Sequence, residues 1–154
     1  MCAPSDAEAT AEHPVRVTAD TNIYISALNY NGPPRAFLEL AVDGEVRLAL
    51  SSEILDEIEA TLRRKFSWPE NRIAEARATL LAITEPIVPS VILDVVKDDP
   101  DDNKILECAQ SAHSECIVSG DKDLLRIRLY DGIPIMTVAE FLKQFGAGIG
   151  HRNG

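Results

Sequence analysis

Short apolar runs alternate with longer amphipathic stretches along most of this chain. Each run is flanked by turn residues or by the start of a helical pattern, as is typical of buried strands. Between the runs, apolar residues recur at helical spacing. This alternation predicts an α/β fold with a central, mainly parallel sheet covered by helices on both faces. The predicted strands are Val15–Ala19, Val46–Leu50, Cys116–Gly120 and Ile133–Met136.

Capping residues and helix breakers, together with apolar spacing, predict the helices. Thr137 and Glu140 have the spacing of a capping box, and Ser51 or Ser52 can cap the helix that follows the second strand. The predicted helices are Ile23–Leu28, Pro34–Val42, a segment after Ser51 or Ser52, Pro69–Ile83, a segment around Ile105–Ala112, a short piece around Leu124 and Leu125, and a last helix ending at Phe145.

The segment before the Ile105–Ala112 helix is less regular. Ile87–Val96 is rich in β-branched residues but is interrupted by Pro89, so only a short strand is expected there. The segment Asp98–Asp102, which has a proline at its centre, predicts a turn.

The length of 154 residues and the apolar content of 45% fit one globular domain with a real core. We expect this domain over residues 15–145. Residues 1–14, which lack the features of a signal peptide, and residues 146–154 are expected to be flexible tails. No apolar run is long enough to predict a membrane span.

The formal net charge of −10 argues against a nucleic-acid binder that works through a basic surface. It does not exclude a nuclease, because metal ions held by acidic residues can receive phosphate oxygens. Two basic clusters, Arg63–Lys65 and Arg126 with Arg128, can hold a phosphate backbone. For each cluster, however, the pattern favours the simpler interpretation of a solvated face or of a charge near a helix end.

Several other chemistries are not supported by the sequence. The three cysteines, Cys2, Cys108 and Cys116, lack C-x-x-C spacing, so they fit reduced thiols of a cytoplasmic protein rather than disulfides or a zinc site. There is no phosphate-binding loop, no dinucleotide-binding glycine motif, and no H-E-x-x-H or G-x-S-x-G motif.

Four carboxylates stand where an α/β fold would bring them together. Asp20 and Asp121 directly follow predicted strands. Glu57 borders the apolar stripe of one helix, and Asp102 projects onto the core face of another. Ligands of open parallel sheets bind at the carboxyl ends of the strands. Repulsion between gathered acids is relieved by protonation or by a hard divalent cation, so the pattern predicts a Mg²⁺ or Mn²⁺ site.

Each acid also has a simpler interpretation when it is taken alone. Asp20 and Asp102 can be helix N-caps, and Glu57 can be one of several solvated glutamates. Asp123 can be a fifth ligand or can cap the next turn. Only the joint placement at successive strand-to-helix junctions favours a metal centre over separate caps.

Four segments of the chain together resemble the PIN-domain family, and specifically the ribonuclease toxins of bacterial toxin–antitoxin modules. The resemblance implies a three-layer α/β/α sandwich. It also implies that the metal ligands are Asp20, Glu57, Asp102 and Asp121, supported by the polar residues Asn22 and Ser119. The segments that carry it are Val17–Asn22, Ser51–Ile58, Asp99–Ala109 and Ser119–Leu125.

The resemblance further implies an activity and partners. The activity is cleavage of RNA that depends on Mg²⁺ or Mn²⁺, with the cation activating water and stabilising the charge on the phosphate. The implied partners are an antitoxin protein and a second copy of the chain.

Two rival interpretations remain open at this stage. A phosphatase of the haloacid-dehalogenase type also begins with a strand-end aspartate, but it normally has a second aspartate where this chain has Asn22. A PIN-like domain that binds RNA or protein without catalysis is the other rival; the presence of all four acids counts against it.

Overall fold

The computed structural model describes residues 14–89 and 100–153, with side chains described for 14–89 and 103–145. The strands are β1 (Val15–Ala19), β2 (Val46–Ser51), β3 (Thr84–Ile87), β4 (Cys116–Val118), β5 (Leu129–Tyr130) and β6 (Ile133–Met136). The helices are α2 (Thr21–Asn29), α3 (Pro33–Val42), α4 (Ser52–Phe66), α5 (Glu70–Ile83), α6 (Pro100–Ala112), α7 (Lys122–Ile127) and α8 (Val138–Asn153).

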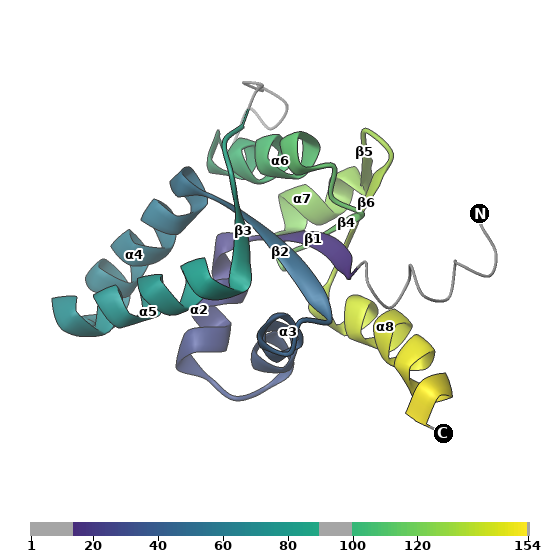
Figure 1. Cartoon of the computed structure of the whole chain (residues 1–154). Coiled ribbons are helices and arrows are strands. Elements are labelled where there is room, and N and C mark those ends of the chain that lie inside the picture. Colours follow the sequence, from purple (N-terminus) through teal and green to yellow (C-terminus); the bar gives the residue numbers. More distant parts are fainter. Residues whose placement is uncertain (1–13, 90–99, 154) are drawn as a thin grey trace.

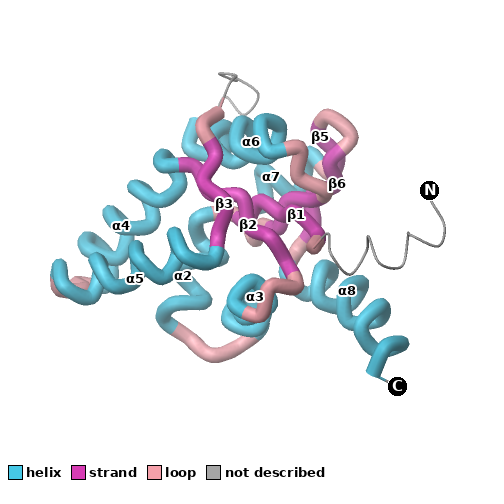
Figure 2. Tube along the Cα trace, viewed as in Figure 1, coloured by secondary structure: helices cyan, strands magenta, loops and turns pink. Residues whose placement is uncertain are grey.

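The described strands form one sheet in the order β3-β2-β1-β4-β6-β5, and among them only β5 runs antiparallel to its neighbour. Figure 2 shows the strands in the middle of the molecule with helices around them. β1 lies between β2 and β4, with Val17 beside Leu48 and Thr18 beside Ile117. Because the neighbours of β1 are parallel to it, the residues that follow β1, β2 and β4 lie at the same edge of the sheet.

Helices cover both faces of the sheet, so the predicted three-layer α/β/α fold is confirmed. Figure 1 shows α6 and α7 on one side and α2, α3 and α8 on the other. α4 and α5 lie side by side and extend away from the sheet. None of the described helices is long and apolar enough to cross a membrane.

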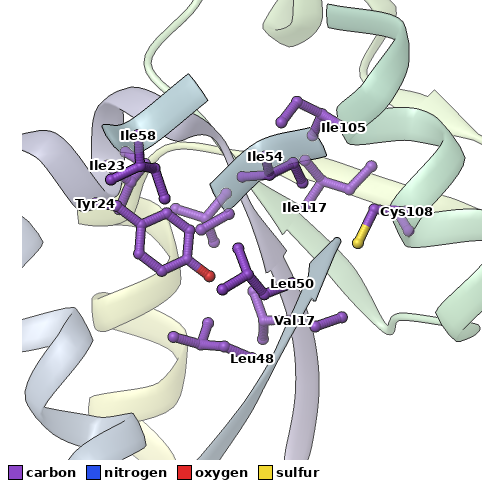
Figure 3. Packing of buried hydrophobic residues seen from close by; sticks show 14 of the residues in the cluster. Val17, Ile23, Tyr24, Leu48, Leu50, Ile54, Ile58, Ile105, Cys108 and Ile117 are labelled. Atoms are coloured by element: carbon purple, nitrogen blue, oxygen red, sulfur yellow. The ribbon is translucent and has the colours of Figure 1, made fainter. Parts of the chain in front are cut away.

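The core is built from alternating strand residues and the helix faces that meet them. Figure 3 shows Val17 and Leu48 near Tyr24 of α2, whereas Ile105 and Cys108 of α6 lie on the other side of the sheet. All five side chains are almost completely buried. The nearly continuous burial of β1 and β2 fits parallel strands that are covered on both faces.

Local signals in the sequence explain several helix boundaries. Ser51 caps α4, because its hydroxyl accepts a hydrogen bond from the N–H of Ile54 at 3.2 Å. The predicted capping box is confirmed at the start of α8. There the N–H of Thr137 donates to Glu140 Oε1 at 2.9 Å, and the N–H of Glu140 donates to Thr137 Oγ1 at 3.1 Å.

Two boundary predictions differ from the structure. A short strand is expected within Ile87–Val96, whereas the described strand β3 covers Thr84–Ile87 and so shares only Ile87 with that segment. Residues 90–99 lie outside the described part of the chain, so the rest of this expectation stays a prediction. β3 contains Pro86, which an edge strand tolerates because its N–H side need not be paired. Within the predicted Asp98–Asp102 turn, residues 100–102 already belong to α6, since proline fits the first turn of a helix.

The end of α8 and the presence of β5 also differ from the prediction. α8 continues to Asn153 rather than ending at Phe145; its glycines weaken a helix, but no proline breaks it. β5, a two-residue strand that pairs with β6, is not predicted at all, because two residues are too few to show a periodicity. The division into one domain and two flexible tails stays a prediction.

Leu80 and Leu81 offer a matched test of the core, since they are neighbours on α5 but are 1% and 42% exposed. We expect Leu80→Ala to lower the free energy of unfolding by about 2–5 kcal/mol, because it leaves a cavity. Leu81→Ala makes the same chemical change and should cost less than about 1 kcal/mol. Urea unfolding followed by circular dichroism measures both; equal losses would contradict the packing of α5.

Candidate metal centre

Asp20 lies where β1 passes into α2. Its main-chain N–H donates to the carbonyl of Val118 at 2.9 Å, so the pairing of β1 with β4 continues through this residue. The residue is only 6% exposed. Although Asp20 occupies the N-cap position of α2, its side chain makes no capping hydrogen bond. Instead Oδ2 accepts a hydrogen bond from the Ser119 hydroxyl at 2.8 Å. The Ser119 hydroxyl, just after the end of the neighbouring strand, therefore helps to orient this carboxylate.

Ser119 joins the ends of β1 and β4 through a single hydroxyl group. The residue is fully buried, and its Oγ both donates to Asp20 and accepts from the main-chain N–H of Asp121 at 2.9 Å. Asp121 caps α7, with Oδ1 accepting from the N–H groups of Asp123 at 2.7 Å and Leu124 at 3.4 Å. The helix cap uses Oδ1 alone, so capping and metal binding by Asp121 are compatible.

Burial raises the pKa of Asp20 above its ordinary value, and the negative charge of Asp121 raises it further. The Ser119 hydroxyl acts in the opposite direction. The nearby N–H groups of Asn22 and Thr21 also lower the pKa, with a smaller effect. The two carboxylates thus interact unfavourably when both are ionised, and a cation bound by them would remove that repulsion.

Glu57 is held near the same turn by Thr21, the first residue of α2. Thr21 Oγ1 donates to Glu57 Oε1 at 2.7 Å, and Thr21 is buried. Lys104 Nζ of α6 lies 3.4 Å from the same oxygen. The Glu57 side chain is 28% exposed, so it is not a freely solvated glutamate. Because Thr21 directly follows Asp20, its hydrogen bond ties Glu57 to the turn that carries Asp20.

The other predicted site residues are less closely connected. Asp102 lies in the first turn of α6, which begins at Pro100, so it is not the N-cap; its side chain lies outside the described part of the chain. Asp123 pairs with Arg126 at 3.0 Å, and it does not cap α7. The Asn22 side chain is exposed. The roles of Asp102, Asp123 and Asn22 stay predictions.

Within the described side chains, no group of three or more histidine, cysteine, aspartate or glutamate residues is placed to hold a metal ion. The structure does connect three of the four predicted acids, because Ser119 links Asp20 to Asp121 and Thr21 links Glu57 to the same turn. Carboxylate oxygens suit a hard divalent cation. Together with the repulsion at Asp20, this donor chemistry fits Mg²⁺ or Mn²⁺.

Sequence reasoning does not identify Thr21 as the partner of Glu57 or Lys104 as a charge at this centre. A hydroxyl residue directly after a strand-end aspartate is the available signal for Thr21. For Lys104 the signal is weaker: it is the first basic residue after the aspartates of the Asp98–Asp102 segment. Both contacts join side chains from different helices, which a linear pattern does not show.

These features define a class of protein: a three-layer α/β domain with interacting carboxylates at the carboxyl edge of a parallel sheet. A family model described as PIN domain matches residues 16–123. The chain therefore belongs to the PIN-domain family.

A solved structure shows the same fold. It is the "Crystal structure of VapBC2 from Rickettsia felis bound to a DNA fragment from their promoter", of which one chain aligns with a TM-score of 0.58 and 18% sequence identity. The alignment covers 79% of this chain and 97% of that chain. No curated protein matches this sequence.

Ser119→Ala tests the hydroxyl that joins the two strand ends. Removing it leaves the buried Asp20 carboxylate without that donor, and we expect the free energy of unfolding to fall by about 1–3 kcal/mol. Urea unfolding at neutral pH with a chelator present measures the change. Ser52→Ala is the control, because the Ser52 hydroxyl is exposed and, among the described residues, donates to Glu53 alone, at 3.3 Å; its cost should be about 0.5 kcal/mol or less. Equal costs would contradict the bridging role.

Asp20→Asn should stabilise the protein when no divalent cation is present. The raised pKa means that the ionised form of Asp20 is disfavoured in the folded state, so wild-type stability is lost as pH rises through the folded-state pKa. The variant has no such loss. Its melting temperature in chelator should exceed that of the wild type at neutral pH, and the gap should close well below the ordinary aspartate pKa of about 3.9. A gap independent of pH would show that ionisation of Asp20 is not the cause.

Proposed function

We propose that this protein is a metal-dependent endoribonuclease that acts as the toxin of a toxin–antitoxin module. The observation that carries the proposal is the Ser119 hydroxyl, which binds the Asp20 carboxylate and the Asp121 main chain at once. This contact keeps two acids side by side at the carboxyl ends of β1 and β4. Membership of the PIN-domain family supports the same reaction class.

In this proposal, Asp20, Glu57, Asp102 and Asp121 hold one or two Mg²⁺ or Mn²⁺ ions. A bound divalent ion supplies Lewis acidity toward the phosphodiester group. The protein's own contribution is to hold these acids in fixed positions. Ser119 orients Asp20 through a neutral hydroxyl, and the N–H groups at the start of α7 orient Asp121. Because none of these donors carries a full positive charge, they orient the carboxylates without balancing the negative charge that would attract a cation.

The proposed partners are an RNA substrate, an antitoxin protein and a second copy of the chain. Support for an antitoxin comes from the resemblance to toxin ribonucleases and from the fold shared with a chain of the VapBC2 structure. The net charge of −10 favours a basic antitoxin segment reaching toward the acidic centre. We also propose a cytoplasmic location, where RNA and a reducing environment are both present.

The decisive experiment is sequencing of the RNA ends that the purified protein produces with Mn²⁺. Asp20→Asn and Asp121→Asn should each abolish cleavage, a loss of at least about 100-fold, because each removes a carboxylate charge from the centre. Asp131→Asn is the matched control. It makes the same chemical change in the turn before β6. Because β6 is parallel to β4, this turn lies at the amino ends of these strands, away from the carboxyl ends where the four acids are expected. Asparagine also tolerates the positive φ of 53° found there. This control should cleave like the wild type.

Other outcomes would identify a rival function. Cleavage that survives both substitutions would disprove the proposed centre. RNA binding without cleavage at any metal concentration would favour a non-catalytic PIN-like domain. Hydrolysis of phosphomonoesters with an acyl-phosphate on Asp20 would instead indicate a phosphatase of the haloacid-dehalogenase type.

A further inference from the structure

Glu57 has two partners of different chemical character, and both contact the same oxygen atom. Thr21 Oγ1 donates to Oε1 at 2.7 Å, and Lys104 Nζ lies 3.4 Å from it. Within the described part of the chain, no hydrogen bond reaches Oε2 of Glu57. Thr21, Glu57 and Lys104 belong to α2, α4 and α6, the first helices after β1, β2 and β3 along the chain. Residues of two neighbouring helices thus hold the Glu57 carboxylate through one of its two oxygens, Oε1.

Thr21 is suited to orient this carboxylate. Its side chain is short and buried at the start of α2, so its hydroxyl has little freedom to move. A neutral donor fixes the direction of a carboxylate without cancelling its charge. Residues that orient metal ligands in this way commonly change metal affinity by about 10–100-fold when they are removed.

Lys104 has a different effect because its ammonium group carries a full positive charge. The side chains of Lys104 and Glu57 are 21% and 28% exposed, so solvent screens the pair only in part. The ammonium group attracts Glu57, and it repels any other cation that binds the same carboxylate. It therefore weakens the binding of a divalent ion at this position.

Two residues of the basic clusters have other partners among the described side chains. Arg63 pairs with Glu70, and Arg126 pairs with Asp123, both with largely exposed side chains. Among the ion pairs of the described residues, two involve a predicted metal ligand: Lys104–Glu57 and Arg126–Asp123.

We propose that Thr21 and Lys104 together set the cation affinity of this centre, Thr21 by orienting the Glu57 carboxylate and Lys104 by opposing the bound positive charge. Both are positioning residues that act through Glu57. The inference rests on the proposed metal-dependent function, and it adds that the two residues have opposite effects on metal binding.

The test is a Mn²⁺ titration of the whole 154-residue chain without RNA, in which the paramagnetic resonance signal of free Mn²⁺ measures binding. Thr21→Val keeps the side-chain shape but removes the donor, and the Kd should rise about tenfold or more. Lys104→Met keeps an unbranched apolar stem but removes the charge, and the Kd should fall about three- to tenfold. Added salt should shrink the Lys104 effect while leaving the Thr21 effect in place.

Conservative variants and a charge control accompany these measurements. Thr21→Ser and Lys104→Arg restore the hydroxyl and the charge, so both should bind Mn²⁺ close to the wild-type Kd. Lys143→Met changes the net charge by the same amount as Lys104→Met at an exposed position of α8, and it should leave the Kd unchanged. Circular dichroism melting in chelator checks that each variant is folded; Thr21→Ala replaces Thr21→Val if valine is not tolerated.

The outcomes separate this inference from the proposed function. Wild-type Kd values for both Thr21→Val and Lys104→Met, with binding lost in Asp20→Asn, would overturn the inference and leave the metal centre intact. A weaker affinity in Lys104→Met would also overturn it, because the ammonium group would then assist the metal. Failure of the wild type itself to bind Mn²⁺ would overturn the proposed function and the inference with it.

Discussion

The arrangement of this centre depends on a carboxylate that is buried where two strands end. An ionised acid is costly to bury unless donors reach it. For Asp20 the main donor is Ser119 of the neighbouring strand segment, whose own main-chain N–H is fixed by the carbonyl of Met136 at 2.9 Å. The position of one carboxylate is therefore set by the register of β1, β4 and β6 together. A slip of any of these strands would take the acid away from its donor.

The chemical nature of the donors matters as much as their positions. Glu70 is paired with Arg63, and Glu59 with Arg77, so these acids have their charge balanced by a guanidinium group. Asp20, by contrast, is bonded by a hydroxyl that leaves its negative charge in place. The cost appears as the raised pKa of Asp20, which burial causes and the charge of Asp121 increases. Retaining an unfavourable charge in a folded protein is typical of a site that binds a cation, because functional sites often sacrifice stability.

The sequence predicts the parts of this structure that depend on local patterns. β1, β2 and β6 are found as expected because each is a buried apolar run, and the start of α8 follows from its capping box. β3 begins before the segment in which a short strand was expected and contains Pro86, which argues against a central strand but is acceptable in an edge strand. Such a position is a property of the whole sheet rather than of the segment.

The same distinction applies to the candidate site. The closeness of Asp20 and Asp121 follows from parallel strands ending at one edge, so it can be reasoned from sequence. The contact of Thr21 and Lys104 with one oxygen of Glu57 cannot, because it depends on how α2, α4 and α6 pack and on the direction of each side chain. The packing of the helices thus determines which donors contact the Glu57 carboxylate, whereas the order of the strands determines which acids lie close together. Under the proposed function, a chain with a net charge of −10 attracts RNA through bound cations and local basic residues rather than through its overall charge.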